Sequence, residues 1–360
     1  MRFLVCLMGY VCIGSTVLSQ DSTLDGTVQP VSSLVGIPKR IAFGSCAHQD
    51  KPQPVLERVV EQSPEIFIYL GDNIYGDSRN MHVLQAKYAK LAAKPEFQSL
   101  RKKVAVLSIW DDHDYGENDS GSEYPFHKES REIFLDFWRV PADSPRRTHQ
   151  GIYGSHLFES NGRTLQVVLL DTRSFRSPLK KNPSVKSLDG KYKNDYQPDP
   201  DPTKTILGET QWQWLEEQLR LPADVRIIAS SIQFGHEYNG YESWTNLPLE
   251  QERMLEIIRR TKASGVLFLS GDVHWAEISR RDFPGLYPLY DVTASGITEM
   301  WYKIESNNFR VGNAVRENHF GMLEFDWEIP SPHITMKIIN HQGKTKCSEK
   351  IDLATLQFQK

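Results

Sequence analysis

The sequence has few cysteines, no excess of basic residues and, beyond its first residues, no long apolar run. Its 42 Lys and Arg against 46 Asp and Glu give a formal net charge of −4, so the composition offers no basic surface for nucleic acid. No run of about 20 apolar residues follows the N-terminal segment, so we expect no transmembrane helix. There is also no internal repeat and no low-complexity tract. Hydrophobic residues at 39% and charged residues at 24% are typical of a globular chain with a sizeable core.

The first residues have the three-part layout of a secretory signal peptide. A positively charged start is followed by an apolar run over residues 3–13 and by small side chains before Gln20. We predict a signal peptide over residues 1–19, cleaved near Ser19-Gln20, and a secreted or periplasmic protein; a buried N-terminal helix is the alternative. A flexible segment over residues 20–38 and one domain over residues 39–360 complete the predicted organisation.

The four cysteines divide into two pairs. Cys6 and Cys12 lie in the predicted signal peptide, which leaves Cys46 and Cys347 in the mature chain. In an oxidising compartment these two could form one disulfide. The other hypothesis makes Cys46 a metal-binding thiolate, because it ends an apolar run, whereas Cys347 lies in a polar tail. We favour the metal hypothesis and keep the disulfide as its alternative.

Six short apolar runs each end in side chains that can bind a metal or a phosphate. Continuous apolar runs of this length predict buried strands, and ligands of open α/β sheets gather beyond the carboxyl ends of strands. The pattern therefore indicates a metal-centred site on a layered α/β fold. The end groups, in chain order, are Cys46; Asp72 and Tyr75; Asp111, Asp112, His113 and Asp114; Asp171 and Arg173; Gln233; and Asp272 with His274.

Helical spacing of apolar residues separates several of these runs, at residues 54–62, 84–91, 127–138 and 249–261. Thr210, followed by Gln213, predicts the capped start of a further helix. Alternating runs at residues 289–295, 320–327 and 333–339 predict antiparallel strands added to a second sheet. The polar stretch at residues 179–205 is long for a loop; we expect a solvated surface loop, with a lid or binding loop as the alternative.

If the strand ends meet, the site gathers more acidic groups than a protein can bury without cations. Carboxylates and a phenolate suit hard cations, and a thiolate and an imidazole suit a transition metal. The simplest partition joins a softer site and an oxygen-rich site through Asp72. The converging groups are Cys46, Asp72, Tyr75, Asp112, Asp114 and Asp272, with a helix cap or a surface charge an equal alternative for Asp114. The softer site would use Cys46, Tyr75 and His274, and the oxygen-rich one Asp112 and Asp272.

The motifs that carry these residues resemble those of the calcineurin-like metallophosphoesterases, in the variant of the alkaline phosphatase D (PhoD) type. The similarity runs from about residue 39 to residue 298, and the order and spacing of the motifs make it specific. Gln233 stands where the wider superfamily usually has histidine. The motifs are Phe43-Gly44-Ser45-Cys46, Gly71-Asp72-Asn73-Ile74-Tyr75, Trp110-Asp111-Asp112-His113-Asp114 and Ser270-Gly271-Asp272-Val273-His274.

The resemblance implies a four-layer α/β/β/α sandwich of two mixed sheets flanked by helices. It also implies a centre holding Fe³⁺ with Ca²⁺, although other divalent metals would fit the same ligands. By resemblance, Asp72 bridges the two ions. The implied iron ligands are Cys46, Asp72, Tyr75 and His274, and the second ion is held by Asp112 and Asp272 with help from Asn118.

These observations predict a metal-dependent hydrolase of phosphate monoesters, phosphodiesters or both, with an alkaline optimum. A hydroxide held between the metals would attack phosphorus, and His113 would contact the phosphoryl group or protonate the leaving oxygen. A histidine held between acids for structure is the alternative for His113, and Arg173 is a candidate phosphate contact. The expected substrate is a small phosphate ester or a phosphodiester polymer.

Two alternative functions stay open at this stage. The first is a phosphodiesterase or phospholipase D-type activity on lipid headgroups or cell-wall polymers. The second is a non-catalytic secreted protein that binds metal or glycan, for which the aromatic residues Trp301, Tyr302 and Trp327 would provide a sugar-binding surface.

Overall fold

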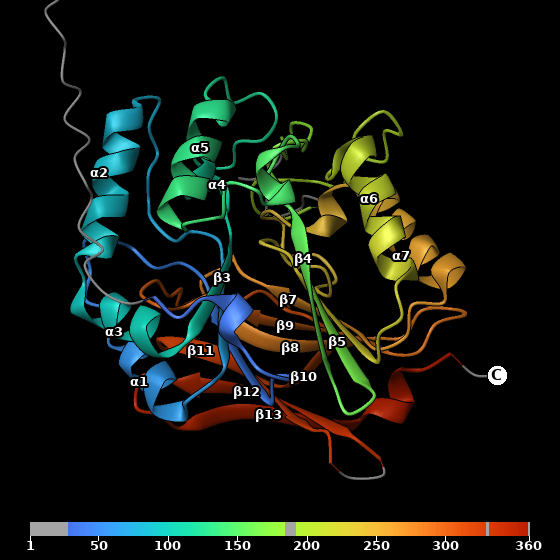
Figure 1. The fold of residues 1–360 in the computed structure, drawn as a ribbon. Helices are drawn as coiled ribbons and strands as arrows, with labels where there is room; N and C mark the ends of the chain where they lie inside the picture. The colour runs from blue at the N-terminus through green and yellow to red at the C-terminus, as the bar shows by residue number, and fades with distance from the viewer. Residues whose placement is uncertain (1–27, 184–191, 329–330, 359–360) are drawn as a thin grey trace, which may run out of the picture.

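In the computed structural model of the protein, which describes residues 28–183, 192–328 and 331–358, two mixed β-sheets pack face to face (Figure 1). The first sheet has the strand order β13-β12-β11-β1-β2-β3 and the second the order β10-β8-β9-β7-β6-β5-β4. The first sheet consists of β1 (Arg40–Gly44), β2 (Ile66–Leu70), β3 (Ala105–Ile109), β11 (His319–Asp326), β12 (His333–Asn340) and β13 (Thr345–Asp352). The second consists of β4 (Gly154–Ser160), β5 (Arg163–Leu169), β6 (Val225–Ala229), β7 (Val266–Ser270), β8 (Ala276–Arg281), β9 (Leu289–Ala294) and β10 (Arg310–Val315).

Helices cover the outer faces of this sandwich, as the four-layer prediction requires. In Figure 1, α1, α2, α3 and α5 lie on the side of β1 to β3, and α6 and α7 lie together on the side of the second sheet. No helix among the described residues is long and apolar enough to cross a bilayer. The helices are α1 (Val55–Gln62), α2 (Met81–Ala92), α3 (Pro95–Lys103), α4 (Asp112–Tyr115), α5 (His127–Phe137), α6 (Gly208–Arg220) and α7 (Pro248–Thr261), with short 3-10 turns at Val31–Ser33, Pro145–Arg147, Trp244–Asn246 and Leu353–Leu356.

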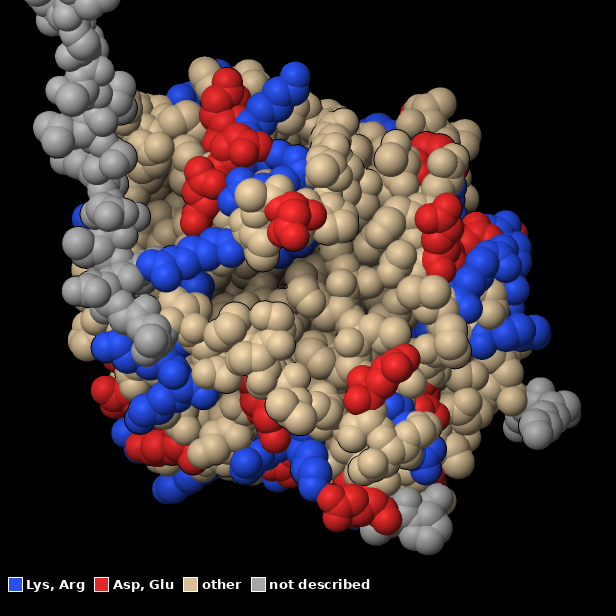
Figure 2. Space-filling view, in the orientation of Figure 1, with Lys and Arg blue, Asp and Glu red and all other residues tan. Residues whose placement is uncertain are grey.

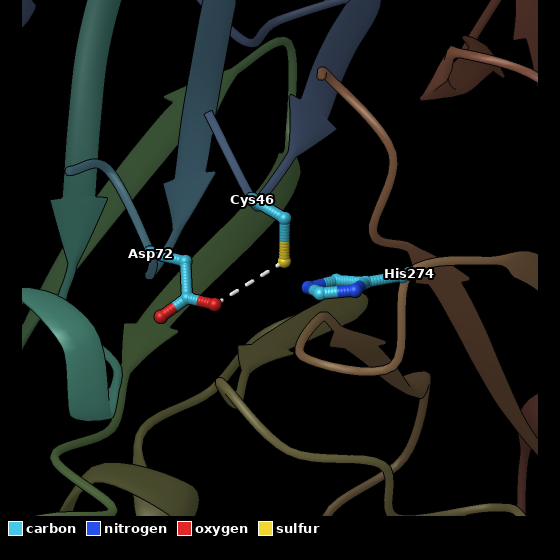
Figure 3. A group of neighbouring side chains, drawn as sticks. All are labelled: Cys46, Asp72 and His274. Carbon is cyan, nitrogen blue, oxygen red and sulfur yellow. Dashed lines mark hydrogen bonds between the residues drawn. The ribbon is translucent and has the colours of Figure 1, made fainter. Parts of the chain in front are cut away.

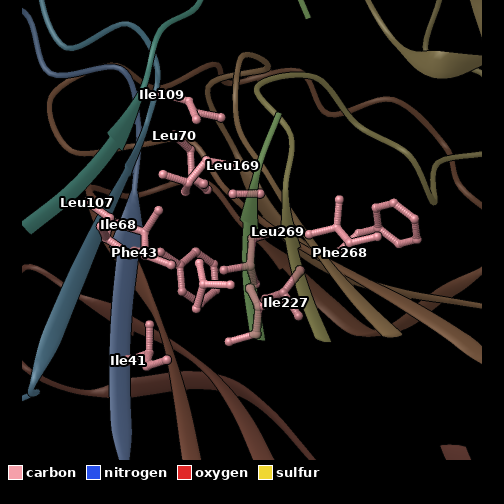
Figure 4. Packing of buried hydrophobic residues seen from close by; sticks show 14 of the residues in the cluster. Ile41, Phe43, Ile68, Leu70, Leu107, Ile109, Leu169, Ile227, Phe268 and Leu269 are labelled. Atoms are coloured by element: carbon pink, nitrogen blue, oxygen red, sulfur yellow. The ribbon is translucent and has the colours of Figure 1, made fainter. Parts of the chain in front are cut away.

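The core between the sheets is built from alternate residues of the central strands (Figure 4). Side chains two apart on a strand share a face, so Ile41 and Phe43 of β1 point the same way as Ile68 of β2. Leu169 and Leu269 come to meet them from the second sheet, and all five side chains are fully buried. Burying a side chain of this size contributes about 1.5–3 kcal/mol, so this interface anchors the strand ends that carry the site.

The six predicted strands all exist, and the three C-terminal runs also form strands with antiparallel partners, but these strands do not join one sheet. β9 lies in the second sheet, antiparallel to β8 and parallel to β7, whereas β11 and β12 are antiparallel strands of the first sheet beside β1. The predicted sheet was wrong for β11 and β12 because alternation reports a half-buried strand and carries no information about its partner. β4, β8, β10 and β13 were not predicted at all.

The predicted cap of the helix at Thr210 is also wrong. Helix α6 begins at Gly208, and Thr210 lies within its first turn. The hydroxyl of Thr205 accepts a hydrogen bond from the Gly208 amide at 2.9 Å and so serves the helix start. Gly208 has φ 67°, and a Cβ there would lie 2.8 Å from the Phe175 ring, which explains why glycine opens this helix.

The N-terminal part of the described chain lies on the domain. Residues 28–38 fall within the segment predicted to be flexible, yet Leu34 and Ile37 pack against the core. The Gln29 amide donates to the carbonyl oxygen of Arg101 at 2.9 Å. The predicted signal peptide, residues 1–19, lies outside the described residues.

We predict that His319 makes the protein sensitive to acid. This buried ring accepts a hydrogen bond from the Ser295 amide at its Nε2, and burial lowers its pKa from 6.5 to about 4. The unfolded chain therefore binds a proton more readily than the folded one between these two pH values, so this contribution to stability is complete above pH 6.5 and falls toward pH 4. Lowering the pH from 7.5 to 5 should cost about 2 kcal/mol of unfolding free energy through this residue.

Urea unfolding at the two pH values tests this expectation by comparing His319→Gln with the unsubstituted protein. The variant should lose about 2 kcal/mol less on acidification, because its side chain does not titrate. His82→Gln on the exposed face of α2 is the matched control and should leave the pH dependence unchanged. Equal acid sensitivity in all three proteins would show that His319 does not carry the effect.

Candidate metal centre

The predicted ligands meet at the carboxyl ends of β1, β2, β3 and β7. Cys46 and Asp72 each follow their strand by two residues, Asp112 opens α4 just after β3, and Asp272 and His274 follow β7. Figure 3 shows Cys46, Asp72 and His274 pointing toward one another from three separate segments of the chain. The sequence-based expectation that these strand ends converge is therefore realised in the structure.

Four of these residues adopt a backbone conformation that side chains normally avoid. Cys46, Asp72, Asp272 and His274 have φ values of 61°, 51°, 71° and 58°. Such left-handed residues cost on the order of 1–3 kcal/mol each and concentrate at functional sites. Backbone hydrogen bonds hold them in place. In one of these bonds the Ala47 amide donates to the backbone carbonyl oxygen of Asp72 at 2.8 Å. These four backbone conformations therefore lower the stability of the fold, and they direct the side chains into the site.

The softer half of the centre contains sulfur, phenol and imidazole. The Cys46 Sγ lies 3.4 Å from Asp72 Oδ2, and the hydroxyl of Tyr75 lies 3.1 Å from His274 Nε2. Ligand atoms of Cys46, Asp72 and His274 lie within 4.8 Å of one another. Burial raises the pKa of the Cys46 thiol and of the Tyr75 phenol, so a bound cation is what would favour their anionic, ligating forms. Burial lowers the pKa of His274 to about 4, which favours the neutral imidazole that binds a metal.

The disulfide alternative is excluded, because both Cys46 and Cys347 are free thiols in the structure. Cys347 is on β13, where its sulfur faces the carbonyl oxygen of Val311 at 3.6 Å.

The oxygen-rich half is a cluster of carboxylates. One oxygen from each of Asp72, Asp111, Asp112 and Asp272 lies within 4.8 Å of the others. Three buried oxygens, Asp72 Oδ1, Asp111 Oδ2 and Asp112 Oδ1, have no hydrogen-bond partner. Burial raises the pKa of Asp72 and Asp272 well above its usual value, and neighbouring carboxylates add to this. Orphaned buried oxygens in a like-charge cluster fit a hard cation.

Asp114 holds the site together without being placed as a ligand. Its carboxylate accepts hydrogen bonds from the amides of Asp111 at 2.7 Å and Asp72 at 3.2 Å, and from the Tyr88 hydroxyl at 3.2 Å. With Asp111 it forms a reciprocal capping box at the start of α4. The helix-cap alternative for Asp114 is therefore confirmed.

His113 lies beside the cluster with one ring nitrogen already engaged. Its Nδ1 is 2.7 Å from Asp77 Oδ1, and its ring centre is 4.3 Å from that of Tyr75. Burial alone would lower the pKa of His113, but Asp112, Asp72 and Asp77 raise it to about 11. One of its ring nitrogens is within 4.8 Å of oxygens of Asp72 and Asp112, so the side chain faces the metal centre.

Arg173 is fully buried behind the carboxylates. Its guanidinium pairs with Asp111 and, at 2.6 Å, with Glu242, and lies 3.8 Å from Asp112. The guanidinium of Arg173 therefore already pairs with acidic side chains of the centre. This favours a role in balancing their negative charge over the predicted contact with phosphate. The Asn118 side chain is exposed, and contact between it and the second ion stays a prediction.

Comparison with known proteins agrees with this geometry. The PhoD-like phosphatase family matches residues 41–358. The chain belongs to this family. It is 24% identical over 285 residues to alkaline phosphatase D of Bacillus subtilis, with 67% of this chain and 47% of that protein covered. The chain therefore spans about half the length of this curated relative.

Two solved structures share the fold of this PhoD-like chain. A structure of PhoD superposes with a TM-score of 0.61 at 18% identity, covering 90% of this chain and 74% of the other. GAP50, described as the anchor in the inner membrane complex of Plasmodium, gives 0.58 at 12% identity, with 90% of both chains covered. At these identities both structures show the fold alone, and the chemistry of the site depends on its side chains.

Several residues of the PhoD-like centre were not singled out from the sequence. Asp119 and Glu242 form a further acidic group with Asp112, and the Asp119 amide donates to Asp112 Oδ2 at 2.7 Å. Asp119 directly follows Asn118 in the sequence, and Glu242 directly follows the stretch Asn239-Gly240-Tyr241. Only the fold brings in Tyr196, whose hydroxyl donates to Asp119 Oδ2 at 2.7 Å.

Tyr196 also shows where part of the long loop goes. Asn194 and Tyr196, in the described part of this loop, lie on the segment that carries Glu242. The Tyr196 amide donates to the carbonyl oxygen of Gly240 at 2.8 Å, and Asn194 Nδ2 donates to that of Asn239 at 2.7 Å. This part of the 179–205 stretch is thus a docked segment beside the metal centre rather than a solvated loop.

Proposed function

We propose that the chain is a metal-dependent hydrolase of phosphoric esters. The observation that carries the proposal is the position of Asp72, which belongs both to the sulfur-containing group and to the carboxylate group. Its Oδ2 faces Cys46, and its buried Oδ1 has no partner. This is the arrangement expected of a carboxylate that bridges two ions.

The residues present fit the two metals implied by the family resemblance. Cys46, Tyr75 and His274 offer the thiolate, phenolate and imidazole that suit Fe³⁺, and Asp112 and Asp272 offer the oxygens that suit Ca²⁺. Asn118 and Asp119 are additional oxygen donors for the second ion. When bound, the ions would neutralise charge on the phosphoryl oxygens and acidify a water molecule.

The protein side chains supply positioning and a proton donor. With its Nδ1 held by Asp77, His113 would offer its Nε2 to a phosphoryl oxygen or to the leaving oxygen. Arg173 would balance the charges of Asp111 and Glu242 behind the ions. We assign His113 the catalytic contact and Arg173 the supporting one.

The proposal also covers the export of the protein and the class of its substrate. We infer that residues 1–19 act as a signal peptide and that the enzyme works outside the cytoplasm on small phosphate esters or phosphodiester polymers, lipid headgroups included. Figure 2 shows small groups of acidic and basic side chains on the face it displays, and both signs occur together there. This mixture agrees with the absence of a basic excess in the composition.

A non-catalytic glycan-binding role has less support. Trp327 is nearly buried, stacks on Phe325, and donates its indole N–H to the carbonyl oxygen of Pro38 at 2.9 Å. Trp301 instead contacts His274 and Tyr241. Among the described residues the aromatic side chains expected to bind sugar therefore do not form one surface.

Metal removal tests the proposal. Protein loaded with iron and calcium should hydrolyse a chromogenic phosphate monoester or diester at alkaline pH, and chelation should lower the rate at least about tenfold because the carboxylate cluster loses its cations. Returning the metals should restore the rate, and metal analysis should find both ions. Protein that contains both ions yet hydrolyses neither ester would overturn the proposal and favour a binding role.

A further inference from the structure

A continuous row of rings borders the candidate metal centre on one side. The ring of His113 lies 4.3 Å from that of Tyr75, and the Tyr75 hydroxyl lies 3.1 Å from His274. The row continues from His274 to Trp301, with ring centres 5.0 Å apart, and from Trp301 to Tyr241 at 4.7 Å. We call these five residues the aromatic wall.

The far end of the aromatic wall is open to solvent. Trp301 and Tyr241 are only partly buried. Met300 and Tyr302, which flank Trp301 in the sequence, are 40% and 78% exposed, which makes them two of the few large apolar side chains exposed in the described part of the chain. Exposed apolar side chains gathered beside a polar site mark a binding surface more often than isolated ones do.

Backbone contacts fix Trp301 relative to the metal centre. Its amide donates to the carbonyl oxygen of His274 at 3.0 Å, and its ring also lies 6.0 Å from that of the buried Trp275. The backbone of Trp301 is therefore tied to that of a predicted metal ligand, so the aromatic wall is part of the site.

The other side of the centre is polar and charged. There Asp119, Glu242 and the buried Arg173 and Arg176 occupy the surroundings of Asp112. An apolar group placed among these side chains would deprive charged atoms of water or partners, at a cost that the Trp301 and Tyr241 end of the aromatic wall avoids.

We propose that the aromatic wall is the subsite for the organic group of the substrate, and that this group is an aromatic or otherwise apolar alcohol. The proposal rests on the proposed phosphoesterase function, because the phosphoryl group at the ions places its alcohol beside the wall. An aromatic group stacked on Trp301 gains binding affinity both from the ring contact and from the burial of its apolar surface.

Trp301→Ala tests the subsite with two esters that differ only in the alcohol. We expect the variant to lower kcat/KM about five- to twentyfold for an aryl phosphate, through a higher KM, and less than twofold for glyceryl phosphate. Trp301→Phe should recover most of the loss, because it keeps a ring. Leu157→Ala, which removes an exposed apolar side chain on the distant strand β4, is the control and should leave both rates unchanged.

A binding measurement separates this proposal from the proposed function. Affinity for a non-hydrolysable aryl phosphonate should fall about five- to twentyfold in metal-loaded Trp301→Ala, whether or not the protein turns over any ester. Equal losses on aryl and glyceryl esters with metal content retained, or unchanged phosphonate affinity, would overturn the subsite. Selective loss of phosphonate binding in a protein without hydrolysis would keep the subsite and reject the catalytic function.

Discussion

Replacing Asp72 with asparagine should lower ester hydrolysis at least about a thousandfold and leave the protein deficient in both metals. Among the described residues Asp72 is the one carboxylate shared by the sulfur-containing and oxygen-rich groups, and the neutral amide removes it. Loss of metal stabilisation worth several kcal/mol in the transition state corresponds to a rate loss of this order. Turnover of a chromogenic ester and metal content per chain are the two measurements.

The metal-free proteins provide an independent readout of the same substitution. Without cations, Asp72→Asn removes one member of a buried like-charge cluster, so the variant should be at least as resistant to urea as the metal-free parent at alkaline pH. A misfolded variant would instead unfold more easily. Asp326→Asn, an exposed position on β11, is the matched control and should change neither metal content nor rate. Full activity with two bound metals in Asp72→Asn would remove Asp72 from the bridging role.

Replacing His113 with glutamine should lower kcat about 10²–10⁴-fold while both metals stay bound. A positioned general acid or phosphoryl contact contributes on this scale, and the ligands of the two groups remain in place without the imidazole. Asp77→Asn should cost less, about tenfold, because Asp77 acts only through His113, by orienting Nδ1 and by helping to raise the pKa of the ring. Rates at saturating ester and metal content per chain measure the effect.

The comparison also decides between the two interpretations of His113. If the ring is merely held between acids for structure, His113→Gln should reduce stability or metal content, and any fall in kcat should be no larger than the fraction of protein lacking metal. A catalytic contact predicts a large fall in kcat at full metal content. His82→Gln serves as the control for a histidine that touches no part of the centre, and its rate should equal that of the parent.

Much of the centre could be predicted because its ligands are tied to local patterns. An apolar run predicts a buried strand, and a ligand type two residues beyond it predicts where that side chain will lie, since carboxyl ends of neighbouring strands meet. Cys46, Asp72 and Asp272 follow this rule, and Asp112 lies three residues beyond its strand. What such patterns lack is the backbone conformation: nothing in the residue types indicates that Cys46 and Asp272 adopt positive φ values.

The supporting residues were harder to find because their partners are remote in sequence. Tyr196 lies in a polar stretch with no strand or helix signal, yet it reaches Asp119 across 77 positions of chain. Arg173 was correctly placed near the site, but only the surrounding acids show that its donors are already paired. Hydrogen bonds and ion pairs of this kind depend on distance in space, which spacing along the chain does not encode.

The sequence alone thus determined the layered α/β class, the central strands and the set of metal-binding residue types, because strand periodicity and strand-end chemistry are local properties of the chain. Only the tertiary structure decided which sheet β9 and β11 join, that Cys46 and Cys347 stay apart, that Asp114 caps a helix, and that Trp301 stands beside His274. These outcomes depend on which buried surfaces pack together, and alternative pairings of the same strands differ in energy only through contacts between distant segments.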